Sequence, residues 1–179
     1  MSEGAPTSLA VCVHDRVACV RVSGQAKFTS ATDFKNLLVQ LQKDGCTEIV
    51  LDLAQCSLMD STFLGVMTAA ARRCESSRKE GRACVLKLCH PTERVLESLE
   101  NLDVLRLFTV QKDGPPFAAF TRVEDGNVTR VELTRTCLEA HETLMKTSPE
   151  NERRFKDAAE YFRQNLRQQD GQNPQDGKE

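Results

Sequence analysis

Two neighbouring side chains near the middle of the chain, Asp60 and Ser61, combine residue types that can carry regulation or catalysis. They follow an apolar strand pattern over residues 48–53 and a loop over 54–60, and a helical pattern begins at Ser61. A helix start leaves about four backbone N–H groups without partners, so either side chain could serve as a cap. A serine there could equally accept a phosphate or act as a nucleophile. These alternatives stay open on the residues alone.

The nucleophile reading requires a base, and the sequence offers His14, His90 and His141. None of them has a sequence context that marks it as a base. Ser61 lies in Asp-Ser-Thr-Phe-Leu-Gly, which differs from the G-x-S-x-G turn of the α/β hydrolases. Glycine-rich nucleotide motifs are also missing from the sequence. We therefore expect a protein that is not an enzyme and that uses no cofactor.

The chain has eight cysteines, but they form no CxxC pair. Most lie in apolar runs, such as Ala-Val-Cys12-Val, which is typical of buried free thiols that pack as small apolar groups. Cys89-His90 is a possible metal-binding pair, but no second doublet stands at ligand spacing. We predict buried thiols and no metal site.

Charge and composition narrow the class of partner. The formal net charge is -2, with basic and acidic residues interspersed and no Trp, so the sequence does not indicate a nucleic-acid surface. It contains no apolar segment of the roughly 18 residues that a membrane span needs, and its first residues lack the pattern of a secretory signal. The expectation is a cytoplasmic protein that binds neither membranes nor nucleic acid.

The apolar patterns alternate between strand and helix periods. Strands are expected at 9–13, 17–22, 48–53, 83–88 and 104–110, and helices at 30–43, 61–77 and from Pro91 onward. The order β-β-α-β-α-β-α-β predicts an α/β fold with a mixed, mostly parallel sheet covered by helices. Gly24 and Ser61 would then lie at ends of the sheet where loops gather.

The character of the sequence changes after residue 110. A cluster of turn-forming residues, Asp113-Gly-Pro-Pro, separates a domain over 1–112 from an extension over 113–167. We expect a strand hairpin from 117–123 and 128–133, two amphipathic helices over 133–146 and 148–166, and a disordered tail over 168–179. The two helices should fold back on the sheet or pair with each other; alternatively, Phe155, Phe162 and Leu166 form a surface for a homodimer or another partner.

The run from Val20 to Val110 resembles a STAS domain of the anti-sigma-factor antagonist family. Three segments carry the resemblance: Arg21-Val-Ser-Gly24 before the first helix, Val50-Leu-Asp-Leu53 as the central strand, and Met59-Asp-Ser-x-x-Leu-Gly65 at the next helix. The resemblance covers about half of the chain. It implies a STAS-like fold, here with a C-terminal helical extension.

The resemblance also implies a function by partner switching. The family carries its phosphorylated serine directly after the aspartate of this motif, which is Ser61 here. The unmodified protein would bind an ATP-binding anti-sigma factor that is also a serine kinase, and a phosphatase would reverse the modification. Two departures from the family are Phe63, where Gly is usual, and the turn Gln25-Ala-Lys27, where an acidic turn is usual. The partner surface would comprise Asp60, Thr62, Phe63, Gly24, Gln25 and Lys27.

Two expectations about exposure follow from this reading. The Ser61 hydroxyl should be displayed at the start of its helix, and Phe63 should be exposed beside it. A competing reading makes the chain a STAS ligand-binding module or an adaptor subunit of a transport or signalling complex, without phosphorylation.

Overall fold

The structure is a computed structural model and describes residues 4–171. The chain forms strands, helices and two 3₁₀ turns in the order β1 (Ser8–His14), β2 (Val17–Ala26), η1 (Phe28–Ser30), α1 (Ala31–Lys43), β3 (Glu48–Asp52), β4 (Cys56–Met59), α2 (Ser61–Lys79), β5 (Val85–Cys89), α3 (Glu93–Asn101), η2 (Leu105–Leu107), β6 (Thr109–Gln111), β7 (Thr121–Arg122), α4 (Arg130–Met145) and α5 (Pro149–Gly171). The expected α/β class is confirmed.

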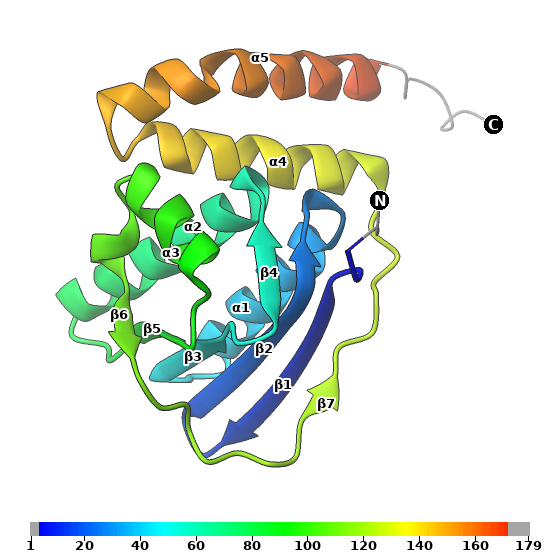
Figure 1. Ribbon diagram of the computed structural model, residues 1–179. Coiled ribbons are helices and arrows are strands. Elements are labelled where there is room, and N and C mark those ends of the chain that lie inside the picture. Colours follow the sequence, from blue (N-terminus) through cyan, green and yellow to red (C-terminus); the bar gives the residue numbers. More distant parts are fainter. Residues whose placement is uncertain (1–3, 172–179) are drawn as a thin grey trace.

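The strands form one mixed sheet with the order β6-β5-β3-β2-β1-β7, and β4 pairs with β2 (Figure 1). The pairs β2–β3, β2–β4, β3–β5 and β5–β6 are parallel, whereas β1 is antiparallel to both β2 and β7. The expected mixed and mostly parallel sheet is therefore confirmed. Parallel neighbours require crossover connections, and α1, α2 and α3 supply them.

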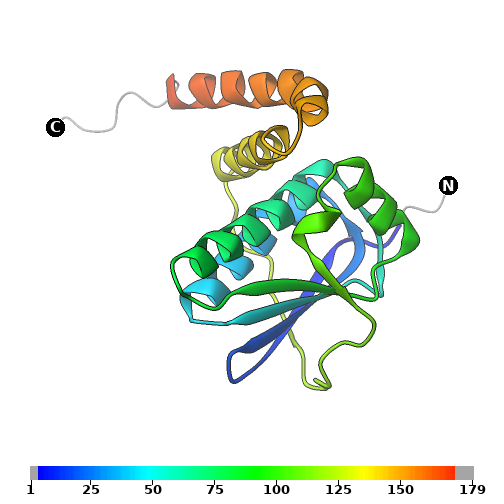
Figure 2. The same ribbon diagram turned by 90° about the vertical axis from the view of Figure 1, so that its left-hand side faces the viewer.

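The main core lies between the sheet and the helices on one of its faces (Figure 2). In the central strand β3, Ile49, Val50 and Leu51 are all fully buried, which explains why its sequence is a continuous apolar run. On α1, Phe34 and Leu38 are also fully buried, as the helical spacing predicts.

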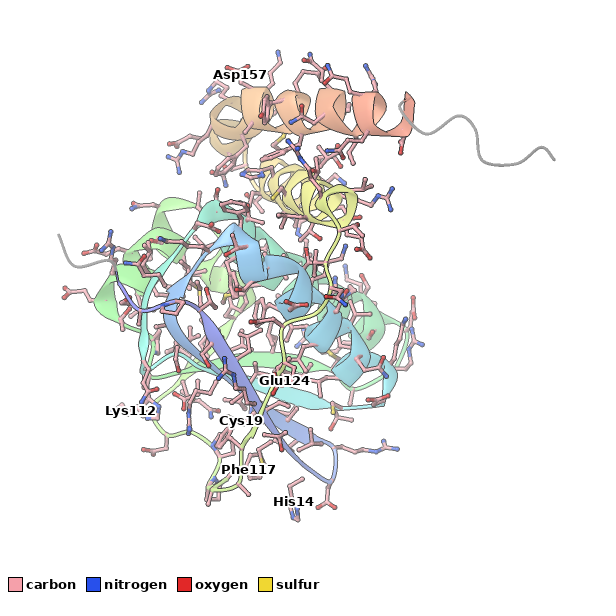
Figure 3. All side chains as sticks on the ribbon, turned by 90° about the vertical axis from the view of Figure 1, so that its right-hand side faces the viewer. His14, Cys19, Lys112, Phe117, Glu124 and Asp157 are labelled. Carbon is pink, nitrogen blue, oxygen red and sulfur yellow. A yellow bond between two sulfur atoms is a disulfide. The ribbon has the colours of Figure 1, made fainter. Side chains whose placement is uncertain are left out.

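The other face of the sheet is partly covered by the segment that follows β6. Phe117 and Phe120 of this segment pack against a small cluster of Cys19, Val50 and Cys89. Figure 3 shows Phe117 below the strand that carries Cys19. The segment then adds β7 to the edge of β1, so the chain reaches α4 after passing across the sheet.

Three expectations for local structure are corrected. β4 lies inside the expected 54–60 loop; its four residues are too few to show a period in the sequence. The expected strand over 104–110 is divided between η2 and β6. The expected hairpin over 117–133 is wrong, because Thr121–Arg122 pairs with β1 and residues 130–133 already belong to α4.

The C-terminal helices α4 and α5 form an antiparallel hairpin (Figure 1). The expected pairing of the two helices is confirmed, but the hairpin packs on α2 rather than on the sheet. Helix α4 begins three residues earlier than expected because Thr129 and Glu132 form a reciprocal capping box, which was readable as Thr-x-x-Glu. Helix α5 continues to Gly171, four residues into the segment expected to be disordered. Residues 172–179 lie outside the described part.

The cysteines differ from the sequence expectation in one respect. Cys74 and Cys84 are paired in a disulfide, whereas all eight cysteines were expected to be free. The six other cysteines are free, and five of them are buried. Within residues 4–171, no helix has an apolar stretch that is long enough to cross a membrane.

Candidate functional site

The start of α2 is capped by Asp60. Its Oδ1 atom accepts a hydrogen bond of 2.9 Å from the backbone N–H of Phe63, and its Oδ2 atom accepts one of 2.6 Å from the backbone N–H of Phe28. The carboxylate therefore joins the first turn of α2 to the turn before α1. Because Asp60 fills the capping role, the hydroxyl of Ser61, the first residue of the helix, is not needed for it.

Asp60→Ala is expected to lower the free energy of unfolding by about 1–2 kcal/mol, since two backbone N–H groups lose their acceptor. Asp60→Asn is the matched control: it keeps one acceptor oxygen and should lose less than Asp60→Ala. Urea unfolding of both variants measures the difference. Equal stability of Asp60→Ala and the unchanged chain would show that the cap contributes nothing.

The Ser61 hydroxyl is engaged by a residue from the C-terminal extension. Its Oγ atom lies 3.0 Å from Nε2 of His141 on α4. The other ring nitrogen, Nδ1, lies 2.7 Å from the backbone carbonyl of Cys137 and must donate to it. In the neutral imidazole Nε2 is then an acceptor, so the Ser61 hydroxyl donates to it. The His141 side chain is held from the far side by the rings of Phe155 and Phe162, at centroid distances of 5.3 and 5.5 Å.

This arrangement corrects both expectations about exposure. Ser61 is half-buried rather than displayed, because α4 lies across the first turns of α2. Phe63 is fully buried rather than exposed, because its ring stacks on that of Phe34 in the core, with centroids 4.4 Å apart. Thr62 is buried as well, and its Oγ1 atom lies 3.9 Å from the Cys137 sulfur. The side chains of Phe63 and Thr62 are therefore not available to a partner in this conformation.

Helix α4 lies close to α2 along a line of small and polar residues. A Cβ atom added to Gly65 would lie 2.5 Å from the backbone oxygen of Ala140, so no side chain fits there. Lys35 of α1 forms an ion pair with Glu139 of α4. The glycine of the Asp-Ser-x-x-Leu-Gly motif thus allows the backbone of α4 to approach α2 closely.

The turn that was expected to contribute to the partner surface lies next to Asp60. The backbone N–H of Asp60 donates to the Ala26 carbonyl, and Gly24 has a φ of 80°, which favours glycine. Lys27 is exposed, whereas Gln25 is half-buried. A cleft of about 810 Å³ separates this turn from the start of α4, and it is lined in part by Gln25, Lys27, Ser30, Asp33, Asp125 and Leu133. The structure therefore brings the expected turn and the start of α2 together.

The contact between Ser61 and His141, which lie 80 positions apart, was not predicted from the sequence. One signal was available: the helical pattern places His141 on the apolar face of its helix, where a polar ring needs a partner. A catalytic serine–histidine pair would also need the imidazole to be accessible to a substrate. His141 is 5% exposed and is sealed by two phenylalanines, so the contact is better explained as a structural latch.

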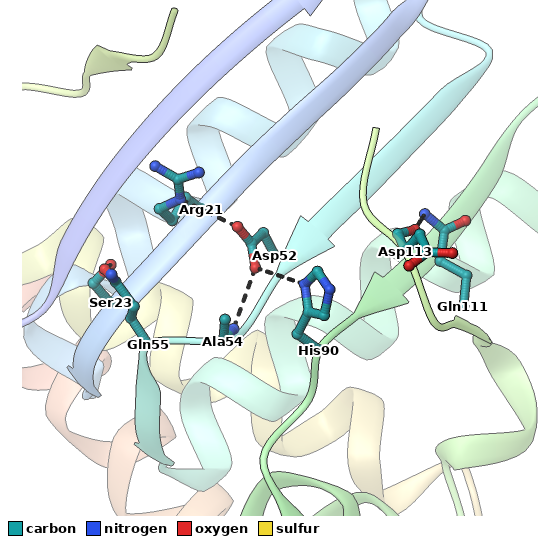
Figure 4. Close-up of polar contacts among 8 residues, drawn as sticks. All are labelled: Arg21, Ser23, Asp52, Ala54, Gln55, His90, Gln111 and Asp113. Atoms are coloured by element: carbon teal, nitrogen blue, oxygen red, sulfur yellow. Dashed lines mark hydrogen bonds and ion pairs between the residues drawn. The ribbon is translucent and has the colours of Figure 1, made fainter. Parts of the chain in front are cut away.

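A second polar cluster lies on the other face of the sheet (Figure 4). Asp52 pairs with Arg21 through Oδ2 at 3.1 Å, and its Oδ1 atom lies 3.5 Å from Nδ1 of His90. The Cys89 sulfur is near enough to complete a possible three-ligand metal group. Burial and the charge of Asp52 raise the pKa of the Cys89 thiol to about 12, and the Arg21 cation already neutralises the carboxylate. We therefore interpret this cluster as a structural ion pair between Arg21 of β2 and Asp52 of β3, and not as a metal site.

Comparison with known proteins agrees with this architecture. A family model described as the STAS domain matches residues 8–115. None of the curated proteins matches the chain. Among solved structures, the chain is similar to the anti-sigma factor antagonist SpoIIAA of Bacillus in its unphosphorylated form, with 16% identity, a TM-score of 0.51, and coverage of 59% of this chain and 89% of that chain. It is also similar to the protein TM1081 of Thermotoga maritima, with 21% identity, a TM-score of 0.50, and coverage of 57% and 78%.

The identities to these solved structures are low, so the likeness establishes the fold. The family match spans β1 to β6 and includes the elements that carry Asp60 and Ser61, whereas α4 and α5 lie beyond it. On this match, the chain belongs to the STAS domain family.

Proposed function

We propose that the protein is an anti-sigma-factor antagonist that acts in the cytoplasm without catalysing a reaction itself. Its partner would be an ATP-binding anti-sigma factor with serine kinase activity, bound at the start of α2 and the adjoining turn over residues 24–28. Phosphorylation of Ser61 by that partner would end the complex, and a phosphatase would restore the binding form.

The observation that carries this proposal is the division of roles between Asp60 and Ser61. Asp60 makes both capping contacts, at 2.9 and 2.6 Å, so Ser61 can be modified without removing the cap. A phosphate adds a charge of about -1.5 to -2 at pH 7. At a helix N-terminus the unpaired N–H groups and the helix dipole favour such a charge by about 0.3–1 kcal/mol. The STAS fold should therefore tolerate the modification.

The effect of the phosphate would appear at the interface with the partner. The added charge stands next to the Asp60 carboxylate, so a partner that accepts one negative group at this position would face two. Juxtaposed like charges across an interface cost several kcal/mol. A loss of about 3 kcal/mol already corresponds to a hundredfold loss of affinity, which is sufficient for a switch.

A second candidate function is favoured by the cover on Ser61. A STAS adaptor subunit of a transport or signalling complex has no need of an accessible serine, and Ser61 is half-buried beneath α4. In that case the protein would bind a protein neighbour or a ligand permanently, without a cycle of phosphorylation and release.

Affinity purification of the full chain from its native host separates the two candidates. Under the first proposal, Ser61→Ala should accumulate an ATP-binding serine kinase at a one-to-one ratio, because the variant binds but cannot be released by phosphorylation. Stable recovery of a transporter ATPase, with Ser61 unmodified in the unchanged chain, would instead establish the adaptor function.

A further inference from the structure

The C-terminal hairpin occupies the surface at which the proposed partner would dock. Helix α4 contacts the first half of α2 and also α1, so it lies directly over Ser61 and Thr62 (Figures 1 and 2). Helix α5 packs mainly on α4 and thus forms the outer layer. While the hairpin is in place, it therefore excludes any partner that must bind at the start of α2.

The contacts beneath α4 are of two kinds. Some are polar or small: besides the bond between Ser61 and His141, the hydroxyl of Thr32 donates to that of Thr136 at 3.0 Å, and the Gly65 position abuts Ala140. The apolar contacts come from Ala140, Leu144 and Phe155, which belong to the main core cluster. Because polar and small contacts make up part of this interface, we expect the hairpin to be able to move relative to the STAS domain.

The residues of the STAS match form nearly all of the sheet and the helices α1, α2 and α3. The family match ends at residue 115, and by then the sheet holds every strand except β7. Apart from α2 and α1, the hairpin is attached through few hydrogen bonds, such as Asn151 Nδ2 to the Leu102 carbonyl at 2.7 Å. Opening the hairpin would leave the sheet and its three covering helices in place.

We propose that the α4–α5 hairpin is a reversible self-inhibitory cover, latched by the contact between Ser61 and His141. The closed form hides Ser61 from a kinase and blocks the docking surface; the open form exposes both. The partner in this scheme rests on the function proposed above, whereas the opening of the hairpin is a property of the isolated chain.

Phosphorylation and closure should exclude each other. In the closed form the Ser61 oxygen has one polar neighbour, His141 Nε2 at 3.0 Å, and behind it lie the rings of Phe155 and Phe162. A phosphate group on the Ser61 oxygen would need the space that the His141 ring occupies at 3.0 Å, so the imidazole and α4 would have to move away. By linkage, phosphorylation of Ser61 would favour the open hairpin by the same factor by which opening favours phosphorylation at equilibrium.

Gly65→Ala in the full chain is the direct test. The added methyl group would lie 2.5 Å from the Ala140 backbone oxygen, and its three nearest neighbours all belong to Ala140. Alanine also favours a helix more than glycine does, so α2 itself should be stabilised. Hydrogen exchange should therefore become at least tenfold faster in the hairpin, residues 130–171, while the strands β2, β3 and β5 keep their protection. Ser76→Ala, on the exposed part of α2, is the matched control and should leave the hairpin unchanged.

A milder pair of variants covers the case in which Gly65→Ala does not fold. Lys35→Glu replaces the ion pair with Glu139 by a repulsion, and Lys35→Glu combined with Glu139→Lys restores it. The single variant should raise the open population about two- to fivefold, and the double variant should return it to the original level. Loss of protection in the sheet together with the hairpin, or no change in the hairpin, would overturn the cover.

These outcomes are independent of the proposed function. Exchange in the isolated chain reports opening whether or not a kinase exists, so a hairpin that opens without any phosphate on Ser61 in the host would retain the cover and reject the phosphorylation switch. Conversely, phosphorylation of Ser61 in a chain whose hairpin never opens separately from the sheet would support the phosphorylation switch and reject the cover.

Discussion

Ser61→Asp is expected to bind the proposed anti-sigma partner about a hundredfold more weakly than Ser61→Ala. Both substitutions remove the hydroxyl that donates to His141, so both loosen the cover, and the main difference between them is a negative charge beside Asp60. If the partner surface must accept that charge in a desolvated position, about 3 kcal/mol is lost, which is a hundredfold change in Kd.

Isothermal titration calorimetry with the purified partner measures this ratio. Circular dichroism and urea unfolding of the two variants provide the control, since the fold should tolerate an acidic residue at a helix N-terminus. Equal affinities for Ser61→Asp and Ser61→Ala would reject the electrostatic switch, even if both variants bind.

Phe63→Ala is expected to lower the free energy of unfolding by about 3–5 kcal/mol. The Phe63 ring is fully buried and stacks on Phe34 at 4.4 Å with an interplanar angle of 15°, so its removal leaves a cavity in the main core. An exposed phenylalanine, as the sequence pattern suggested, would lose almost nothing on truncation.

Phe63→Leu is the matched control, because it keeps most of the apolar volume and should lose clearly less stability than Phe63→Ala. Urea unfolding compares the stabilities of the two variants, provided that their m-values are the same. A change of less than about 1 kcal/mol for Phe63→Ala would mean that the ring is not in the core.

The repeating α/β units were predictable because their apolar patterns are strong and continuous. The strand over 48–53 and the helix over 30–43 were recognisable from residues such as Ile49, Leu51, Phe34 and Leu38, which are all buried. Strand β4 was not predictable, because four residues show no period, and β7 depends on pairing with a strand more than a hundred residues earlier.

The site was predictable in part. The pattern around Asp60 and Ser61 placed both residues at a helix start, and the structure confirms that placement. The pattern could not reveal what covers Ser61, because His141 is 80 residues away and reaches it through the packing of a separate hairpin. The burial of Phe63 was missed for a different reason: its ring stacks on Phe34 of α1, and α2 buries more of its surface than one apolar stripe indicates.

Intact mass spectrometry of the full chain from its native host tests the central claim most directly. The account predicts a fraction of the protein that is heavier by one phosphate, mapped to the peptide with Ser61 and absent in Ser61→Ala. A chain that carries no phosphate on Ser61 in any growth condition, including a host without the phosphatase, would contradict it.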